Sequence, residues 1–365
     1  MVSFTPTEDQ QLLVDTINRY ALNDIRKIAH EADESGEAPL NVVKTGWQIG
    51  LVPSAVPAEL GGFGELSAIT GVLAAEELAF GDLAVALHVL TPALFAYPVI
   101  LYGTAEQRET LLPAFLEETP TPATAALLEP GVFFDPRDLK TTAARRDGRI
   151  ILNGAKAYVP LAAESQHMLV YARDSESGRV DGYIVARDTA GVQIEKREQL
   201  MGLHALPTYR VHFNDVAVEP DMVLGGAVGC DYEALLVRGN VALAALAVGV
   251  ARASFEYARD YAKQRVQFNK PIAQNQSIAF LLADMALEID GVRLMAWEAA
   301  WKLDKGEDAT QEAYLARQAA NKMALFVTDG GLQVLGGYGF IREYPAERWL
   351  RNGRGFPTFD GLALI

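Results

Sequence analysis

One acid stands near the C-terminal end of the sequence, in the stretch RGFPTFDGLALI: Asp360, between an aromatic residue and a glycine. On a short glycine-hinged loop, a partly desolvated carboxylate could act as a general base and remove a proton from a bound substrate. The same residue could instead be a solvated side chain with no chemical role. The other motifs of the chain indicate which of these two interpretations of Asp360 is correct.

Two further stretches have residue types that suit a nucleotide. RVQFNKPI combines a cation, an amide and an aromatic face in Arg265, Gln267 and Phe268, which suits a pyrophosphate and an adenine ring. QVLGGYGF carries Gly336 and Gly337, which permit positive φ and the close approach of a ligand to the backbone. Each pattern also has a simpler structural interpretation, because arginine commonly caps a helix C-terminus and glycine commonly ends a helix.

Composition limits the partners of the chain. The 365 residues carry a formal net charge of -15, which repels phosphate backbones and anionic lipids, so a nucleic-acid or membrane role is disfavoured.

The single cysteine, Cys230, cannot form an internal disulfide, and we see no secretory signal pattern; both favour a reducing cytoplasm. Cys230 is expected to be a passive thiol. The five histidines show no ligand spacing, so no metal site is expected.

The most apolar stretch, Leu83 to Leu101, approaches the length of a membrane span. Because Pro92 and Pro98 interrupt it, we expect a pair of buried helices instead. The acids Glu76 and Glu77, which precede this stretch, are expected on a solvated helix face.

Periodicity divides the chain into three regions. Residues 1–120 show helical spacing of apolar residues, and Thr7 with Gln10 forms a capping-box pattern. Residues 121–228 contain short alternating or β-branched runs separated by turn residues, which predicts a small β domain. Residues 229–365 contain amphipathic stretches of roughly 25 to 35 residues, which predict a helical bundle with apolar surface left for contacts between subunits. The predicted fold class is α+β.

Several motifs, in the same order and spacing, make the sequence resemble the acyl-CoA dehydrogenase family. They are PAELGGFGE, AAEELAFGDLAVAL, ILYGTAEQRETLLPAF, LLEPG, NGAKAYV, YAKQRVQFNKPIAQNQS, FLLADMALEID and QVLGGYGFIREYPAERWLRNGRG. No single motif is decisive, but together they cover nearly the whole chain. The resemblance implies a helical N-terminal domain, a small middle β-barrel or sandwich domain, and a C-terminal domain like a four-helix bundle.

The resemblance also implies a reaction. Family members remove a proton beside an acyl-CoA thioester while FAD accepts hydride from the neighbouring carbon, and an electron-transfer flavoprotein is the usual acceptor. Asp360 stands where the family usually places a glutamate as base. FAD would be shared between subunits of a homodimer or homotetramer, and the acyl tunnel would draw on Leu87, Leu90 and Leu94. The implied contacts are Leu128, Tyr158 and Val159 to the chain's own flavin, and Arg265, Gln267, Phe268, Gln276, Gln333, Gly336 and Gly337 to the FAD of a neighbouring subunit.

The chain departs from the family at its own flavin site. Leu128 and Leu362 stand in place of threonines. Phe134 replaces a small residue, and Pro160 lacks the hydroxyl and the N–H that the family residue offers to the flavin. Tyr158 can still stack on a flavin ring. Aspartate is also shorter than glutamate by roughly 1.5 Å, and a misplacement of about 1 Å can cost on the order of a hundredfold in rate.

These departures leave three functions open. The first is a self-sufficient FAD-dependent acyl-CoA dehydrogenase that uses Asp360 as its base. The second is a non-catalytic subunit that pairs with a paralogue in a heterotetramer and lends FAD contacts to it. The third is a flavin-free homologue that binds acyl-CoA or a protein, with Phe133 and Phe134 filling the flavin or thioester space.

Overall fold

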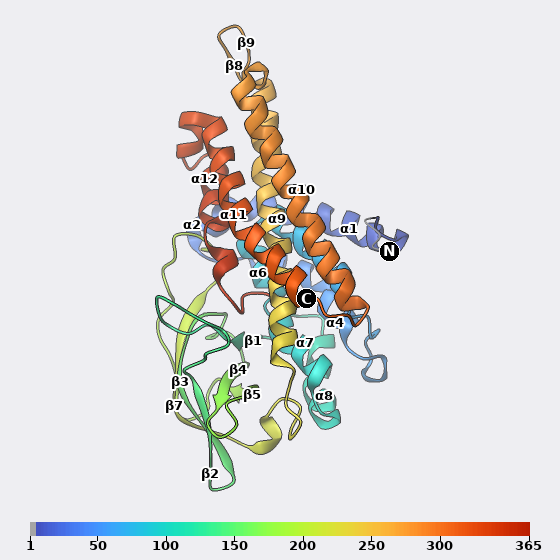
Figure 1. The fold of residues 1–365 in the computed structure, drawn as a ribbon, viewed down its shortest axis with the longest axis vertical. Helices are drawn as coiled ribbons and strands as arrows, with labels where there is room; N and C mark the ends of the chain where they lie inside the picture. Colours follow the sequence, from blue (N-terminus) through green and yellow to red (C-terminus); the bar gives the residue numbers. More distant parts are fainter. Residues whose placement is uncertain (1–4) are drawn as a thin grey trace.

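A computed structural model describes residues 5–365 and shows three regions that meet along one long helix, α9 (Tyr232–Gln264) (Figure 1). The first helix begins at the predicted capping box, in which Thr7 Oγ1 accepts from the Gln10 N–H at 3.2 Å and Gln10 Oε1 accepts from the Thr7 N–H at 3.0 Å. A π-helical turn, Ala21–Ile25, leads into the second. The helices of this N-terminal region are α1 (Glu8–Tyr20), α2 (Arg26–Ser35), α3 (Leu40–Gln48), α4 (Leu51–Ala55), α5 (Ala68–Gly81), α6 (Leu83–Leu90), α7 (Ala93–Tyr102) and α8 (Ala105–Leu111).

The apolar stretch from Leu83 forms the helix pair α6 and α7, which is almost wholly buried and bent by 40°. Pro92 separates the two helices as predicted, but Pro98 lies inside α7, so it does not end that helix. Its ring removes one backbone hydrogen bond there. Within residues 5–365, one helix, α9, is by itself long and apolar enough to cross a membrane, and 78% of its apolar window is buried inside the protein.

The middle region is a mixed β-sheet. In the described part of the chain it has seven strands in the order β1–β4–β2–β3–β7–β6, with β5 paired to β4. Strands β1 and β2 run parallel to β4, and the other neighbours are antiparallel. The strands are β1 (Ala123–Ala126), β2 (Thr142–Arg146), β3 (Arg149–Pro160), β4 (His167–Asp174), β5 (Val180–Ala186), β6 (Val192–Ile194) and β7 (Thr208–Val218).

An irregularity in β3 releases one aromatic residue from the ladder. The pairing of β3 with β7 shifts register between Lys156 and Val159, and Tyr158 has a positive φ of 52°. The Tyr158 N–H donates to Glu198 Oε2 at 3.1 Å. Such bulges re-aim a side chain. Here the ring of Tyr158 is brought against Phe359 of the C-terminal region.

The C-terminal region consists of long helices, as predicted. The Ala- and Val-rich middle of α9 is buried among α5, α10 and α11, so the N-terminal and C-terminal regions share one apolar core. Figure 1 shows a small hairpin, β8–β9, at the tip of the long helices. The remaining elements are β8 (Val266–Gln267), β9 (Lys270–Pro271), α10 (Gln276–Asp304), α11 (Thr310–Leu335) and α12 (Ala346–Gly353).

A buried ion cluster joins α5 to α9 and α10. Glu76 and Glu77 are only 5% and 7% exposed, so the prediction of a solvated face is wrong. Arg252 Nη1 donates to Glu76 Oε1 and to Glu77 Oε1, both at 2.7 Å, and Arg293 Nε donates to Glu76 Oε2 at 3.0 Å. Arg252 and Arg293 lie far from the two glutamates in the sequence, so no local pattern predicts these ion pairs.

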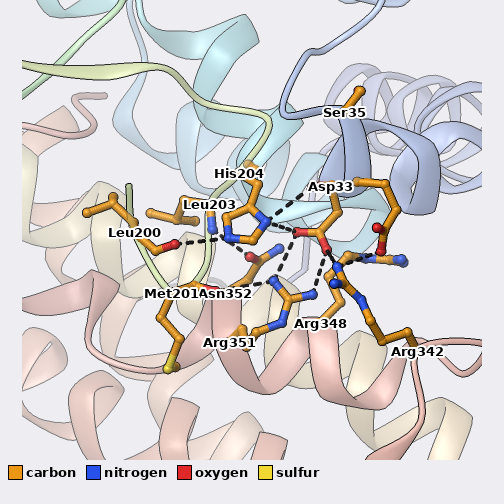
Figure 2. A network of polar contacts seen from close by, with 12 residues as sticks. Asp33, Ser35, Leu200, Met201, Leu203, His204, Arg342, Arg348, Arg351 and Asn352 are labelled. Carbon is orange, nitrogen blue, oxygen red and sulfur yellow. Dashed lines mark hydrogen bonds and ion pairs between the residues drawn. The ribbon is translucent and has the colours of Figure 1, made fainter. Parts of the chain in front are cut away.

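A second polar network joins the three regions just before the loop that holds Asp360 (Figure 2). Arg351 on α12 donates from Nη1 to Asp33 Oδ1 at 3.0 Å, and Arg342 Nη2 lies 3.3 Å from Asp33 Oδ2. His204, from the connection between β6 and β7, places Nδ1 at 3.3 Å from Asp33 Oδ1. Burial raises the pKa of Asp33, but the hydrogen bonds and charge of Arg351 outweigh it, so the pKa is lowered. The network thereby fixes the helix that leads into the loop.

Candidate active site

Asp360 lies on a loop bounded by two glycines in the left-handed region. Gly355 and Gly361 have φ of 79° and 81°, and a 3₁₀ turn, Phe356–Thr358, lies between them. Glycine adopts this conformation at little cost. At Gly361 space is also short, because an added Cβ would lie 2.8 Å from Leu127 Cβ. The loop is therefore packed tightly against the end of β1.

An arginine that the sequence analysis did not identify holds the Asp360 carboxylate. Arg317 Nη1 on α11 donates to Asp360 Oδ1 at 2.6 Å, and the two side chains are 8% and 16% exposed. The same Nη1 donates to Asn240 Oδ1 on α9 at 2.6 Å, and Arg317 Nε donates to the carbonyl of Pro357. A signal for this role existed, since Arg317 follows the buried Ala313 by four residues and so shares its face of the helix. A charge on an apolar face requires a buried partner.

An apolar cavity of about 30 Å³ adjoins Asp360. A space of this size holds roughly two water molecules. Of the leucines predicted for the acyl tunnel, Leu94 lines the cavity, whereas Leu87 and Leu90 belong to the core between α5, α6 and α9. Gly239 lines it from α9, opposite α7. The carboxylate thus faces a small apolar chamber.

Tyr232 separates this chamber from a wider cavity of about 660 Å³ that opens at the surface. Its hydroxyl donates to the carbonyl of Pro136 at 2.7 Å. Burial raises the pKa of Tyr232, and the charge of Asp360 raises it further, so the side chain stays a neutral phenol. Arg137 and Arg179 line the outer cavity. Asp231 and Glu233 line it too, so two arginines and two acids lie next to the apolar chamber, an arrangement that the sequence analysis missed.

The residues predicted to face the chain's own flavin lie together on the β domain. The carbonyl of Leu128 accepts from the Ala157 N–H at 2.8 Å, and the side chains of Leu128 and Val159 are buried. The ring of Tyr158 stacks on that of Phe359, with centroids 4.7 Å apart and planes 8° apart. One face of Tyr158 is thus covered by the residue that precedes Asp360. A flavin ring can stack on Tyr158 only from the other face, or after Phe359 moves aside.

Four of the residues predicted for a neighbour's FAD come together in an open cavity of about 440 Å³: Arg265, Gln267, Gly336 and Gly337. Arg265 is also the C-cap of α9, so its simpler interpretation as a residue that ends a helix applies as well. Its guanidinium lies 5.6 Å from the ring centroid of Tyr338. A Cβ added to either glycine would meet no atom within 4 Å. The cation, the aromatic ring and the open backbone fit the adenine and pyrophosphate end of FAD. The other three predicted residues are exposed outside this cavity: Phe268, Gln276 and Gln333.

A buried ion pair supports the strand end that carries Leu127. Lys156 Nζ donates to Glu129 Oε1 at 2.9 Å and to the Leu127 carbonyl at 3.0 Å, while the Thr141 N–H donates to Glu129 Oε1 at 2.8 Å. Burial lowers the pKa of Lys156 to about 8 against the attraction of Glu129. Burial also raises the pKa of Glu129, but the charge of Lys156 outweighs it and the pKa is lowered. Both groups are therefore charged at neutral pH.

The remaining reactive side chains do not form a second centre. Cys230 is buried, and burial raises the pKa of its thiol to about 11, which makes it a poor nucleophile. Residues 5–365 contain no group of three or more His, Cys, Asp or Glu side chains that could hold a metal ion. The chemistry described above therefore centres on Asp360.

Known proteins resemble this chain over nearly its full length. Residues 7–119, 124–216 and 233–363 match the N-terminal, middle and C-terminal domains of acyl-CoA dehydrogenases. The chain is 34% identical to a 3-(aryl)acrylate reductase of Clostridium sporogenes, covering 98% of this chain and 96% of the relative. It is 31% identical to the mitochondrial short-chain specific acyl-CoA dehydrogenase of Bos taurus, covering 98% and 88%. Butyryl-CoA dehydrogenase from Megasphaera elsdenii superposes with a TM-score of 0.87 at 30% identity, over 96% of this chain and 94% of that one.

Proposed function

The chain belongs to the acyl-CoA dehydrogenase family, and on this premise we propose that it oxidises a short acyl-CoA thioester to the α,β-unsaturated thioester, with Asp360 as the base. The relatives are named as dehydrogenases or as a reductase, which favours a FAD-dependent oxidoreductase acting on a CH–CH bond over both alternatives, the non-catalytic subunit and the flavin-free homologue. The observation that carries the proposal is the anchored carboxylate of Asp360 beside an apolar chamber.

The proton chemistry belongs to this chain's own residues. Asp360 takes the proton from the carbon next to the thioester carbonyl, and the electron pair of that C–H bond becomes the new carbon–carbon double bond. When bound, FAD supplies the acceptor for the hydride that leaves the neighbouring carbon. An acyl group that fills this apolar chamber would displace the water that the chamber can hold, which strengthens the interaction of the Asp360 carboxylate with the substrate.

The small chamber favours a short acyl group. About 30 Å³ accommodates a few carbon atoms only after side chains adjust, whereas a long chain would need the walls themselves to open. Two of the relatives described above are named for small substrates, butyryl-CoA and short-chain acyl-CoA. We therefore propose a short acyl chain as the substrate class.

The outer cavity is suited to the phosphate-bearing part of coenzyme A. Arg137 and Arg179 line it together with the acids Asp231 and Glu233, and Tyr232 lies between it and the chamber. Arg137 Nη2 lies 2.8 Å from Glu233 Oε2, with both side chains about half exposed. Exposed ion pairs of this kind contribute roughly 0 to 1 kcal/mol, so a phosphate can compete for the arginine. The thioester would then lie beside Tyr232, with the acyl group inside.

We also propose that FAD is shared between subunits. The cavity around Arg265 and Gly336 fits the adenine end but lies on the C-terminal helices, away from Asp360. The exposed residues Phe280, Leu287 and Leu294 recur every seven positions on α10, which suits contact with another copy of the chain. A homodimer or homotetramer would bring this cavity to a neighbour's flavin, with an electron-transfer flavoprotein as the acceptor.

The test is the flavin content and turnover of the purified chain. The wild-type protein should bind FAD, and butyryl-CoA should bleach the flavin absorbance under anaerobic conditions. Asp360→Asn keeps the size of the side chain and can still accept from Arg317, but it cannot remove a proton. We expect FAD binding to persist and turnover to fall by roughly 10² to 10⁴-fold.

The matched control is Asp138→Asn, which removes an exposed carboxylate paired with Lys140 and should leave turnover unchanged. Full turnover of Asp360→Asn would exclude this residue as the base. A wild-type chain that binds FAD only when a paralogue is present would support the partner-subunit alternative instead.

A further inference from the structure

We propose that Arg317 positions the catalytic base, by locking the Asp360 loop to α9 and α11 and leaving one carboxylate oxygen free for the substrate. The inference rests on the proposed role of Asp360. Arg317 would not touch the acyl group, so it is a positioning residue and acts through the carboxylate that it holds.

The contacts of Arg317 reach three segments that are distant in sequence. Its side chain starts on α11, bonds Asn240 on α9 at 2.6 Å, and bonds the loop twice, at the carbonyl of Pro357 and at Asp360 Oδ1. Pro357 and Asp360 both lie between the left-handed residues Gly355 and Gly361. Arg317 therefore holds in place the part of the loop between Gly355 and Gly361, which these two glycines would otherwise leave free to rotate.

The remaining oxygen of the base is available. In the part of the chain that the structure describes, Asp360 Oδ2 has no hydrogen-bonding partner, while Asp360 lines the apolar chamber. The two oxygens therefore have different roles: Oδ1 accepts the hydrogen bond from Arg317, and Oδ2 accepts the proton of the substrate.

An aspartate base depends strongly on such an anchor. Its side chain has fewer rotatable bonds than glutamate, so the carboxylate cannot reach further when the loop shifts, and a shift of about 1 Å costs on the order of a hundredfold. Only arginine can make these contacts together, because its planar group donates from several nitrogens in fixed directions. A lysine at position 317 would keep the charge but lose the simultaneous hold on Pro357, Asn240 and Asp360.

The first experiment needs no bound flavin. Hydrogen–deuterium exchange of the peptide that covers residues 355–361 is measured in the wild-type chain, in Arg317→Gln and in Arg293→Gln. Arg293 is the control, since its guanidinium is also partly buried and ion-paired, with Glu76, but it lies on α10 away from the loop. We expect faster exchange of the loop in Arg317→Gln alone. Arg317→Lys, which keeps the buried charge, replaces Arg317→Gln if that variant does not fold.

The second experiment measures turnover of the FAD-loaded protein. We expect Arg317→Gln to lower kcat by about a hundredfold, with KM changed by only about twofold, and Arg317→Lys to be intermediate. With substrate deuterated next to the thioester, the isotope effect on kcat should increase, because a misplaced base makes proton removal slower relative to the other steps. Arg293→Gln should change the melting temperature without changing the isotope effect.

The two experiments separate this inference from the proposed function. If loop exchange, kcat or the isotope effect in the Arg317 variants stays at the wild-type value, Arg317 does not position the base. If Asp360→Asn keeps full turnover, the base assignment itself fails, whatever the Arg317 variants do. Loss of turnover in Asp360→Asn together with wild-type behaviour of the Arg317 variants overturns only the positioning role.

Discussion

Leu364→Ala should lengthen the acyl chain that the protein accepts, because Leu364 forms part of the wall that closes the chamber beside Asp360. Leu364 lines the chamber, and the next residue, Ile365, lines a separate cleft of about 920 Å³ between helices of the N-terminal region. The same division occurs on α7, where Leu94 faces the chamber and Tyr97 faces the cleft. Few side chains therefore separate the small chamber beside Asp360 from the large cleft in the N-terminal region.

The size of the effect follows from the atoms removed. Leu364 is 7% exposed, and its change to alanine removes three carbons from the wall, which gives room for about three methylenes of substrate. Each buried methylene contributes about 0.8 kcal/mol, so three contribute about 2.4 kcal/mol, or roughly 60-fold in an equilibrium or rate ratio. The same change should lower the free energy of unfolding by about 2 to 5 kcal/mol.

The assay compares kcat/KM for heptanoyl-CoA and butyryl-CoA, which differ by three carbons. The ratio should rise by roughly 60-fold in Leu364→Ala. Leu87→Ala is the control, since Leu87 is fully buried but lines neither cavity, so it should lose similar stability without changing the ratio. An unchanged ratio in a folded, FAD-loaded Leu364→Ala protein would refute the assignment of this wall.

Three further changes test the residues that hold the loop and the strand end around Asp360 in place. Glu129→Gln should cost up to about 3 to 5 kcal/mol by leaving Lys156 without its partner. Because Glu129 raises the pKa of Lys156 against burial, its loss should lower that pKa below about 8, so in thermal melts the deficit should be largest in mild acid and shrink as the pH rises toward 8. Gly361→Ala should reduce kcat more than Gly355→Ala, since both require a strained φ but only Gly361 lacks room for a Cβ. The pKa of Asp33 is lowered in the folded state, so its stabilising contribution is present at neutral pH and is lost as the pH falls below about 4. Asp33→Asn should therefore melt lower at neutral pH but decline less in acid, and an equal acid decline in both proteins would contradict this.

Local patterns were sufficient to predict the helices and the small β domain. The Thr7 capping box and the long amphipathic helices appear as expected, since capping and periodicity act over a few residues. Pro92 and Pro98 show the limit of such rules. Proline costs a helix one hydrogen bond wherever it lies, but tight burial of α7 outweighs that cost at Pro98.

Contacts across the fold were not predictable from one sequence. Glu76 and Glu77 have the acidic pattern of a solvated face, and only the buried arginines of α9 and α10 reverse that interpretation. Arg317 reaches Asp360 across 43 residues for the same reason. Arg265 and Gly336 lie in short motifs whose residue types suggest a ligand, and they line one cavity, but their role in binding a nucleotide stays a prediction. Phe268 shares the motif of Arg265 but lies outside the cavity and is 89% exposed at the hairpin, so its predicted contact with a neighbouring subunit also stays a prediction.

The small chamber and the anchored carboxylate of Asp360 together suggest which side chain would move to admit a substrate. Arg317 ties Asp360 to α11, so movement of Asp360 and its loop to admit an acyl group would break two hydrogen bonds, one to Asp360 Oδ1 and one to the Pro357 carbonyl. Tyr232, on the opposite side, is held by one hydrogen bond to Pro136, in a segment where Phe133 is 96% exposed. Rotation of Tyr232, whose ring packs against that of Tyr171, would break this single hydrogen bond and join the chamber to the outer cavity. We therefore predict that a substrate enters past Tyr232 while Asp360 stays in place.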